Sequence, residues 1–255
     1  VPTEAELARR ECRSYESGVQ LLQRILESRR SQWKGKGKYK EPAAPDTTNL
    51  PELPEGWIWV SAEQVCGSVR DGTHDTPAYV LEGVPLITSK NLTEQGIDYA
   101  NVKYISVSDH QEISRRSGVD PGDVLFAMIG TIGNPCEVKT AKTFSIKNVG
   151  LFKQNPEFLA SAYLCHWLEA LSFCKWLGPR LKGTTQKFAP LGLLREIPVP
   201  LPSFNEQKRI VAEVDRRFSL VVEIETQVNA NLLRTDRMRQ STLSAAFSAR
   251  LHTNA

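Results

Sequence analysis

The first forty residues carry a heptad pattern of apolar positions. Steps of four and three alternate along Ala8, Cys12, Tyr15, Val19, Leu22, Leu26, Arg29 and Trp33. This spacing predicts one helix of about seven turns whose seam faces another helix. Arg29 interrupts the seam, and Gly18 is expected to weaken the helix by about 1 kcal/mol relative to alanine. The helix should end in the lysine–glycine run at 34–38, before an extended, proline-rich linker at 41–54.

Residues 55–204 show short apolar runs separated by turn residues, a pattern typical of a globular domain of strands and helices. Strands are expected at 57–60, 84–87, 102–107 and 124–129. One helix is expected over 156–176, with Leu159, Tyr163, Trp167 and Leu171 on one face. The alternating prolines of 197–202 remove backbone donors, so this run should be extended without being a central strand.

From Ser203 onward the pattern returns to helical spacing. Ser203 and Glu206 have the spacing of a capping box, and neither proline nor glycine follows them. The expected seam consists of Val211, Val214, Phe218, Val221, Val228 and Leu232, with the polar Glu225 at the skipped position. A helix of about 45 residues would be about 68 Å long and would need a partner helix for this seam.

These segments together predict an α+β fold. A helical region at 1–40 and a linker at 41–54 precede the globular mixed α/β domain at 55–204. A long coiled-coil helix at 205–255 follows the domain. The chain has 255 residues, of which 40% are hydrophobic and 24% are charged, as in an ordinary globular protein.

The net charge of +3 is divided unevenly along the chain. It is +5 over residues 1–40, −10 over 41–138, +7 over 139–195 and +1 over 196–255. The basic block at 139–195 is a candidate surface for phosphates, although charge alone favours a plain solvated face. On the first interpretation, DNA meets this half of the domain, and the acidic half faces away or toward a protein partner.

Three short motifs invite a chemical interpretation. Asp71, His74 and Asp75 have the residue types of an acid–base site, but Asp71-Gly72 is also a turn signal. The loop at 130–135 follows an apolar strand and either offers backbone N–H groups to a phosphate or simply turns the chain. The loop at 183–187 is polar and either contacts nucleic acid or is a plain loop. Motifs for a nucleophile elbow, a zincin or a Walker A loop are absent.

Cysteine spacing and hydropathy argue against a zinc protein, a secreted protein and a membrane protein. The five cysteines form no CxxC pair, which argues against a zinc site and favours free thiols in a reducing cytoplasm. No run of 18 apolar residues occurs, and the N-terminus lacks the apolar segment of a signal peptide. We therefore expect no metal, no membrane span and a cytoplasmic location.

The motifs occur in an order that resembles one known family, the specificity (S) subunits of Type I restriction–modification enzymes. The resembling blocks are Leu53–Trp57, Asp71–His74 with Pro77, Ile87–Leu92, Gly122–Phe126, Gly130–Gly133, Gly183–Phe188, Ile197–Pro202, Glu206–Val211, and Arg239–Ser241 with Ala245–Leu251. Together they cover nearly the whole chain. The domain at 55–204 is similar to a target recognition domain of that family.

The resemblance implies a non-catalytic DNA reader without a cofactor of its own. Its implied partners are double-stranded DNA, methyltransferase (M) subunits that carry S-adenosylmethionine, and a restriction (R) subunit. Such subunits have two recognition domains separated by two long helices. This chain has one domain, so it resembles a C-terminal half, either a natural half-subunit or a piece of a longer one.

A two-fold pair of such chains would read a bipartite, inverted DNA target. A 68 Å helix would set a spacing of about 20 base pairs at about 3.4 Å per pair. The expected homodimer contacts are Tyr15, Val19, Leu22, Leu26, Val211, Val214, Phe218, Val221, Val228 and Leu232. The alternatives are a hydrolase or transferase that uses Asp71, His74 and Asp75, and an inert coiled-coil scaffold.

The candidate DNA-contacting residues are Thr73, His74, Lys90, Asn91, Lys147, Arg180, Lys182, Thr184, Gln186 and Lys187. The lysines should hold phosphates. Asn91 and Gln186 have the amides that pair with adenine in the major groove.

Overall fold

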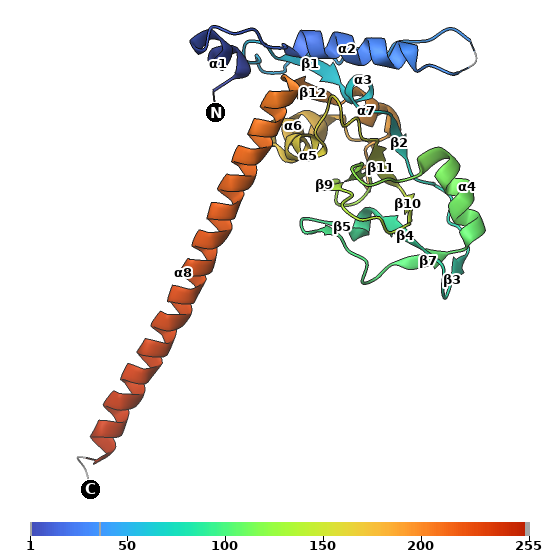
Figure 1. The fold of residues 1–255 in the computed structure, drawn as a ribbon. Coiled ribbons are helices and arrows are strands. Elements are labelled where there is room, and N and C mark those ends of the chain that lie inside the picture. Colours follow the sequence, from blue (N-terminus) through green and yellow to red (C-terminus); the bar gives the residue numbers. More distant parts are fainter. Residues whose placement is uncertain (1, 36, 253–255) are drawn as a thin grey trace. The chain divides into compact units, whose positions relative to one another are not determined.

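Residues 2–35 and 37–252 are described by a computed structural model, in which the chain divides into two units. The first unit is Val1–Ile210 and the second is Val211–Ala255. Residues 1–40 and 41–54 therefore belong to the same unit as the domain that follows them. The structure is a mixed α+β domain with a long C-terminal helix, which confirms the predicted fold class (Figure 1).

The N-terminal region forms two helices, so the prediction of one continuous helix is wrong. Helix α1 is Glu4–Arg10 and helix α2 is Gly18–Ser31. Cys12, in the middle of the predicted helix, has φ of 51°, which no α-helix accommodates. Tyr15 consequently lies in the connecting loop. Each helix begins at its own capping box, on Thr3 and on Ser17.

The buried face of α2 is one position away from the predicted seam. It consists of Gly18, Leu21 and Ile25, whereas Val19 is 46% exposed and Leu22 and Leu26 are half-buried. Gly18 is in close contact with the domain, because a Cβ atom added to it would lie 2.0 Å from the Leu201 carbonyl oxygen. The first unit thus buries the face with Gly18, Leu21 and Ile25, and it leaves the predicted seam partly exposed.

Two four-stranded sheets form the centre of the domain. One has the order β10-β4-β7-β3 and the other β2-β11-β8-β9. Within these two sheets of the described chain, the β10–β4 pair is parallel and the other pairs are antiparallel. The first sheet contains β3 (Tyr79–Val80), β4 (Val84–Thr88), β7 (Lys103–Ile105) and β10 (Ser145–Lys147). The second contains β2 (Val69–Asp71), β8 (Val124–Ala127), β9 (Gly133–Glu137) and β11 (Val149–Phe152).

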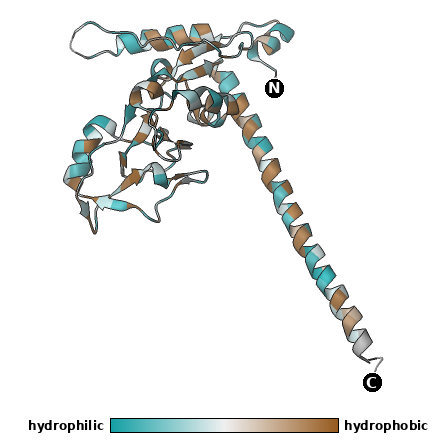
Figure 2. Ribbon diagram, turned by 180° about the vertical axis from the view of Figure 1, so that it is seen from behind, coloured by the Kyte–Doolittle hydropathy of each residue, from teal (hydrophilic) through white to brown (hydrophobic). Residues whose placement is uncertain are grey.

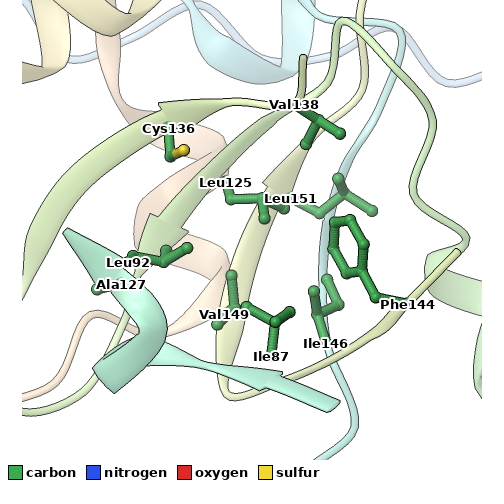
Figure 3. Packing of buried hydrophobic residues seen from close by; sticks show 10 residues of the cluster. All are labelled: Ile87, Leu92, Leu125, Ala127, Cys136, Val138, Phe144, Ile146, Val149 and Leu151. Carbon is green, nitrogen blue, oxygen red and sulfur yellow. The ribbon is translucent and has the colours of Figure 1, made fainter. Parts of the chain in front are cut away.

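Side chains from both sheets form one hydrophobic core. Figure 3 shows the residues of this cluster, which are Ile87, Leu92, Leu125, Ala127, Cys136, Val138, Phe144, Ile146, Val149 and Leu151. All are at most 6% exposed. The short ladder of β5 (Leu92–Thr93) and β6 (Gly96–Ile97) packs beside β9, after the 3-10 turn η1 (Ser89–Asn91). This core holds the edges of the two sheets in fixed positions.

The other helices are shorter than the sequence suggests. The predicted helix 156–176 is divided into α5 (Ser161–Glu169) and α6 (Leu171–Leu177), because Ala170 has an extended backbone with ψ of 138°. The predicted strand 102–107 ends early, since Ser106 caps α4 (Val107–Ser117). The remaining helical elements are α3 (Ala62–Val65), η2 (Gly178–Arg180) and α7 (Leu191–Glu196).

The proline-rich run near residue 200 becomes a strand with one partner. Among the described residues, strand β12 (Pro198–Leu201) pairs only with β1 (Ile58–Ser61), as the absence of donors on Pro198 and Pro200 allows. Helix α8 (Phe204–His252) follows directly, and the Ser203 hydroxyl accepts the Glu206 N–H at 3.2 Å. Residues 253–255, included in the predicted helix, lie outside the described residues.

The start of α8 is locked into the first unit by Gln207, which is 0% exposed. Its Oε1 accepts the Ala160 N–H at 3.0 Å, and its Nε2 donates to the Phe158 carbonyl at 3.0 Å. In the second unit, by contrast, α8 exposes apolar side chains along its length. Phe218, Val221, Val228 and Leu232 are 50–59% exposed, and apolar bands recur along the helix in Figure 2.

Candidate nucleic-acid interface

A concavity of about 690 Å³ lies beside the first sheet and the turn after β8. Its polar lining residues are Tyr79, Thr88, Ser89, Lys90, Asn91, Asp98, Asn101, Lys103, Thr131, Lys147, Asn148 and Gln186. Four of the predicted DNA-contacting residues, Lys90, Asn91, Lys147 and Gln186, are therefore brought to one site. Cationic, amide and hydroxyl groups of this kind bind phosphates and base edges.

Strand register places two of the lysines. Strand β4 lies between β7 and β10, and Leu86 pairs with Lys103 on one side and with Ser145 on the other. Lys147, two residues after Ser145, pairs with Thr88 and donates a hydrogen bond to the Thr76 hydroxyl. Lys103 comes from the acidic part of the sequence, so cations from both parts line one concavity.

Asn148 forms the corner between the two sheets. It is the single residue between β10 and β11, and its φ is 53°, a conformation that asparagine tolerates better than most residues. Its N–H donates to the Thr73 carbonyl at 3.1 Å, and its carbonyl accepts the Ser89 hydroxyl at 2.9 Å. The chain thus fixes the backbone of a residue that lines the concavity.

His74 links this corner to a buried carboxylate. Its Nδ1 lies 2.9 Å from Asn148 Oδ1, and its Nε2 lies 2.9 Å from Asp71 Oδ2. Asp71 is only 2% exposed and also accepts a hydrogen bond from Arg116. Both ring nitrogens of His74 are thus engaged within the chain.

This network does not support the acid–base interpretation of Asp71, His74 and Asp75. The Asp71 carboxylate is enclosed and bound to two donors, and it is therefore not available to a substrate. Asp75 lies in a different depression, of about 300 Å³, together with Thr73 and Arg116. The three side chains do not converge on one reactive position.

Asn91 lines the concavity but has its amide occupied. Its Oδ1 accepts the Thr88 N–H at 3.0 Å and the Thr88 hydroxyl at 2.9 Å, and its Nδ2 donates to the Asp98 carbonyl at 3.2 Å. The side chain is 7% exposed. These hydrogen bonds conflict with the predicted pairing of Asn91 with a base. They indicate instead that Asn91 holds the shape of the 88–98 loop.

The loop at 183–187 is held at its base and exposed along its length. Lys182 and Phe188 exchange two backbone hydrogen bonds of 2.9 and 2.8 Å, and the Ala189 N–H donates to Met128 at 2.9 Å. Gln186 lies near the turn after β8, with its Nε2 3.8 Å from a Cβ built on Gly130. Lys182 at the base of the loop, and Thr184 and Lys187 within it, are exposed but do not line the concavity.

The basic block of the sequence is not one surface. Lys153 binds Asp120 and Asp123, and Arg195 lies 3.5 Å from Glu63. Arg180 stacks on the Trp176 ring at 4.7 Å, and its charge helps to lower the pKa of Asp46, after the hydrogen bonds from Thr48. Several cations that the sequence suggests for DNA are therefore engaged with other parts of the protein.

Sequence reasoning missed Lys103, Asn101, Thr131 and Asn148 at this site. Lys103 and Asn101 were hidden in the acidic part of the chain, and only strand register brings Lys103 opposite β4. Asn148 follows Lys147 within the basic block at 139–195. Nothing in the sequence indicates that it adopts a left-handed backbone at a corner between two strands.

Within residues 2–35 and 37–252, no group of three histidine, cysteine or acidic side chains is arranged to hold a metal ion. No helix in that part of the chain is both long and apolar enough to cross a membrane.

The fold and the concavity define a mixed α+β domain with the side-chain chemistry of a nucleic-acid-binding surface. The Type I restriction modification DNA specificity domain family matches residues 82–234, and the chain belongs to this family. Specificity subunits of the family are non-catalytic within the restriction–modification complex and carry no cofactor, because S-adenosylmethionine binds the M subunit. This finding overturns the alternative of a hydrolase or transferase.

Two Escherichia coli proteins are among the relatives. The specificity subunit of the Type I restriction enzyme EcoBI is 28% identical over 204 residues, which cover 78% of this chain and 43% of that protein. The corresponding EcoDI subunit is 26% identical over 204 residues, covering 79% of this chain and 44% of that protein. The chain thus spans less than half the length of these relatives.

Solved structures support the fold. A chain from a type I R-M system, studied for its complex assembly and conformational transition, matches with a TM-score of 0.52 at 19% identity. The match covers 87% of this chain and 48% of the other. The HsdS subunit from Thermoanaerobacter tengcongensis matches with a TM-score of 0.50 at 18% identity, over 86% of this chain and 47% of that one.

Proposed function

We propose that this chain recognises one half of a bipartite DNA target for a Type I restriction–modification complex. The concavity that carries Lys90, Lys103 and Lys147 supports this proposal most directly. Lysines suit the phosphates of the backbone, while the amides of Asn148 and Gln186 suit base edges. The family description, which names DNA specificity, points to the same ligand.

Contacts with the backbone should extend beyond the concavity. Lys182, Thr184 and Lys187 are exposed in a loop whose Gln186 reaches the concavity, so DNA bound there would pass close to them. Thr73 and His74 do not line the concavity, but each contacts Asn148, which does. Arg180 is the least supported candidate, because it stacks on Trp176.

The family relationship supports a proposal for the protein partners. One of the matching structures is of a type I R-M system studied for its complex assembly, and the E. coli relatives are specificity subunits of Type I restriction enzymes. We propose that this chain likewise docks M subunits, which carry S-adenosylmethionine, and an R subunit. A cytoplasmic location is part of the same proposal, since DNA and these partners are found there.

The exposed seam of α8 supports dimerisation through the second unit. Val221, Val228 and Leu232 recur at coiled-coil spacing and are at least half exposed. Two copies related by a two-fold axis would present two recognition domains to an inverted target. Val19, Leu22 and Leu26 on α2 offer a second apolar strip, although it is narrower than the sequence suggests.

Light scattering at micromolar concentration tests the dimer. The wild-type chain should have twice the mass of one copy, and Val228→Glu should reduce the mass to that of a monomer. Ala230→Glu adds the same charge two residues away, off the seam, and should leave the dimer intact. A monomeric wild-type chain would contradict dimerisation without affecting DNA recognition.

Selection from a random library of DNA duplexes tests recognition itself. The chain should enrich a short motif, and Lys182→Ala should weaken binding to all sequences while reducing the salt dependence. An oligomer that enriches no sequence would instead support the scaffold alternative.

A further inference from the structure

Asp98 carries the one carboxylate among the described residues that line the concavity. We propose that its Oδ2 accepts a hydrogen bond from the amino group of a cytosine in the target DNA. The inference rests on the proposed function, because it assumes that duplex DNA enters the concavity. It adds a specificity-determining residue and the base that the residue accepts.

The backbone of Asp98 is held by the hairpin that it closes. Strands β5 and β6 pair Leu92 with Ile97, and Leu92 lies in the hydrophobic core while Ile97 packs against it. Asp98 follows β6 directly, and its N–H donates to the Asn91 carbonyl at 2.8 Å. In return, Asn91 Nδ2 donates to the Asp98 carbonyl at 3.2 Å. The side chain therefore starts from a fixed position in the concavity, as base readout requires.

The carboxylate of Asp98 is held at one oxygen and open at the other. Oδ1 accepts the Ala100 N–H at 2.8 Å, which orients the side chain. Oδ2 has no hydrogen-bond or ion-pair partner within the described residues, although Lys90, Lys103 and Lys147 line the same concavity. Asp98 is half-buried, so Oδ2 is an oriented acceptor that a ligand in the concavity can reach.

The charge of Asp98 indicates which part of the DNA it meets. An ionised carboxylate only accepts hydrogen bonds, and its charge repels phosphates. The three lysines of the concavity suit the DNA backbone, but Asp98 forms no ion pair with any of them. It therefore does not serve to neutralise a lysine of the site. The group on DNA that suits Asp98 is a donor at a base edge.

The four bases differ in the donors that they present in the major groove. Guanine presents two acceptors, and thymine presents an acceptor and a methyl group, so neither offers a donor to a carboxylate. Adenine has an amino group, but its N7 acceptor lies beside that group and would face the negative charge. Cytosine offers its N4 amino group with no acceptor of its own beside it, which suits a single free carboxylate oxygen. The geometry thus assigns a cytosine within the target half-site to Asp98.

Duplex selection with the full chain tests this assignment, using Asp98→Asn. Asparagine keeps an oxygen for the Ala100 N–H, so the turn is preserved, but it places an NH2 group at the position of Oδ2. The wild-type chain should prefer one C·G pair about 10- to 100-fold over the other pairs, and the variant should lose that preference. The variant should also bind DNA without the motif more tightly than the wild type, because a charge that repels phosphates has been removed.

Asp46→Asn is the matched control. Asp46 Oδ1 accepts the Thr48 N–H at 2.9 Å, so this aspartate binds the backbone two residues ahead, as Asp98 does. Asp46 is exposed in the linker and does not line the concavity. The control should select the wild-type motif with the wild-type preference at every base pair. Far-ultraviolet circular dichroism would establish that each variant is folded.

The outcomes separate the two proposals. If the wild-type chain selects a motif and Asp98→Asn keeps the same preference at every C·G pair, base reading by Asp98 is overturned while DNA recognition stands. A motif without a C·G pair, or a loss of preference confined to an A·T pair, would overturn the assignment of cytosine. If the wild-type chain selects no motif, the proposed function itself fails.

Discussion

Lys153 tests whether a lysine of the basic block stabilises the fold or contacts DNA. It lies in the basic block of the sequence, but its Nζ is 2.5 Å from Asp123 Oδ2 and 2.6 Å from Asp120 Oδ2. Asp123 is 0% exposed, whereas the Lys153 side chain is 23% exposed. We expect Lys153→Met to destabilise the fold and to leave DNA binding unchanged, because the lysine neutralises a buried carboxylate.

The magnitude follows from what remains around Asp123. Removing one partner of a buried ion pair typically costs about 3–5 kcal/mol. Here the carboxylate keeps two backbone donors, the N–H of Asp120 at 2.7 Å and that of Gln154 at 2.9 Å. Partial exposure of the lysine lowers the cost further. We therefore expect a loss of about 2–3 kcal/mol in the free energy of unfolding.

Urea unfolding followed by tryptophan fluorescence measures this loss. The control is Lys139→Met, at an exposed lysine of the same block, which should change the free energy of unfolding by less than about 0.5 kcal/mol. A Lys153→Met variant as stable as this control would refute the reasoning, and so would a large decrease in DNA affinity in a folded Lys153→Met protein.

The pH dependence of the same variant follows from linkage. Partial burial opposes the charge on Lys153, but the hydrogen bonds to Asp120 and Asp123 outweigh it and raise the pKa above the ordinary value of 10.5. A group whose pKa is raised by folding contributes its full stability below the unfolded value and loses it as the pH rises through the folded value. On the alkaline side, the stability difference between wild type and Lys153→Met should therefore begin to shrink above about pH 10.5.

Two further predictions concern the joints between the N-terminal helices, the domain and α8. Gly18→Ala should destabilise the fold by about 1–3 kcal/mol in chemical denaturation, because its Cβ would lie 2.0 Å from the Leu201 carbonyl oxygen. Gly192→Ala, in a helix with nothing within 4 Å of the new Cβ, should be neutral or stabilising, and equal effects at the two glycines would contradict the packing. Burial raises the pKa of the Glu206 carboxyl, and this effect outweighs the Glu4 N–H and Arg209, which lower the pKa. The folded protein therefore resists ionisation of Glu206. Folding stability should decrease as the pH rises from the ordinary pKa of a glutamate through the raised pKa of Glu206. Glu206→Gln should remove this decrease in a pH series of thermal unfolding, whereas Glu225→Gln, on an exposed position of α8, should retain it.

The sequence predicts those features that depend on local periodicity and backbone chemistry. The long helix after Ser203 is one of them, because neither glycine nor proline interrupts it and the Ser203 hydroxyl caps its start. The single partner of β12 is another, since Pro198 and Pro200 cannot donate to a second strand. These features need no knowledge of what packs against them.

Tertiary packing decides the features that the sequence misplaces. The heptad pattern of the first helix is regular through Cys12 and Tyr15, but two capping boxes and a left-handed Cys12 divide it. Gly18 looks like a weak point in a helix, yet the close approach of Leu201 requires it. The capping boxes are local, each joining residues three apart, whereas the contact that requires Gly18 comes from a residue far away in the chain.

The candidate site shows the same division. Lys90, Lys147 and Gln186 could be proposed from residue type alone, and the fold brings them together. Lys153 is also a lysine of the basic block, but it forms an ion pair with the buried Asp123. Lys103 and Asn148 could not be proposed, because strand register and a left-handed corner place them.

The salt dependence of DNA binding tests the central claim, that DNA binds in the concavity, most directly. The measurement compares the wild-type chain with a variant in which Lys90, Lys103 and Lys147 are all alanine. Each phosphate contact contributes about 0.9 to the slope of log affinity against log salt, so the triple variant should lose about 2.7 from that slope. A control with alanine at Lys38, Lys139 and Lys175, which do not line the concavity, should keep the wild-type slope. An unchanged slope for the concavity variant, with a reduced slope for the control, would contradict the account.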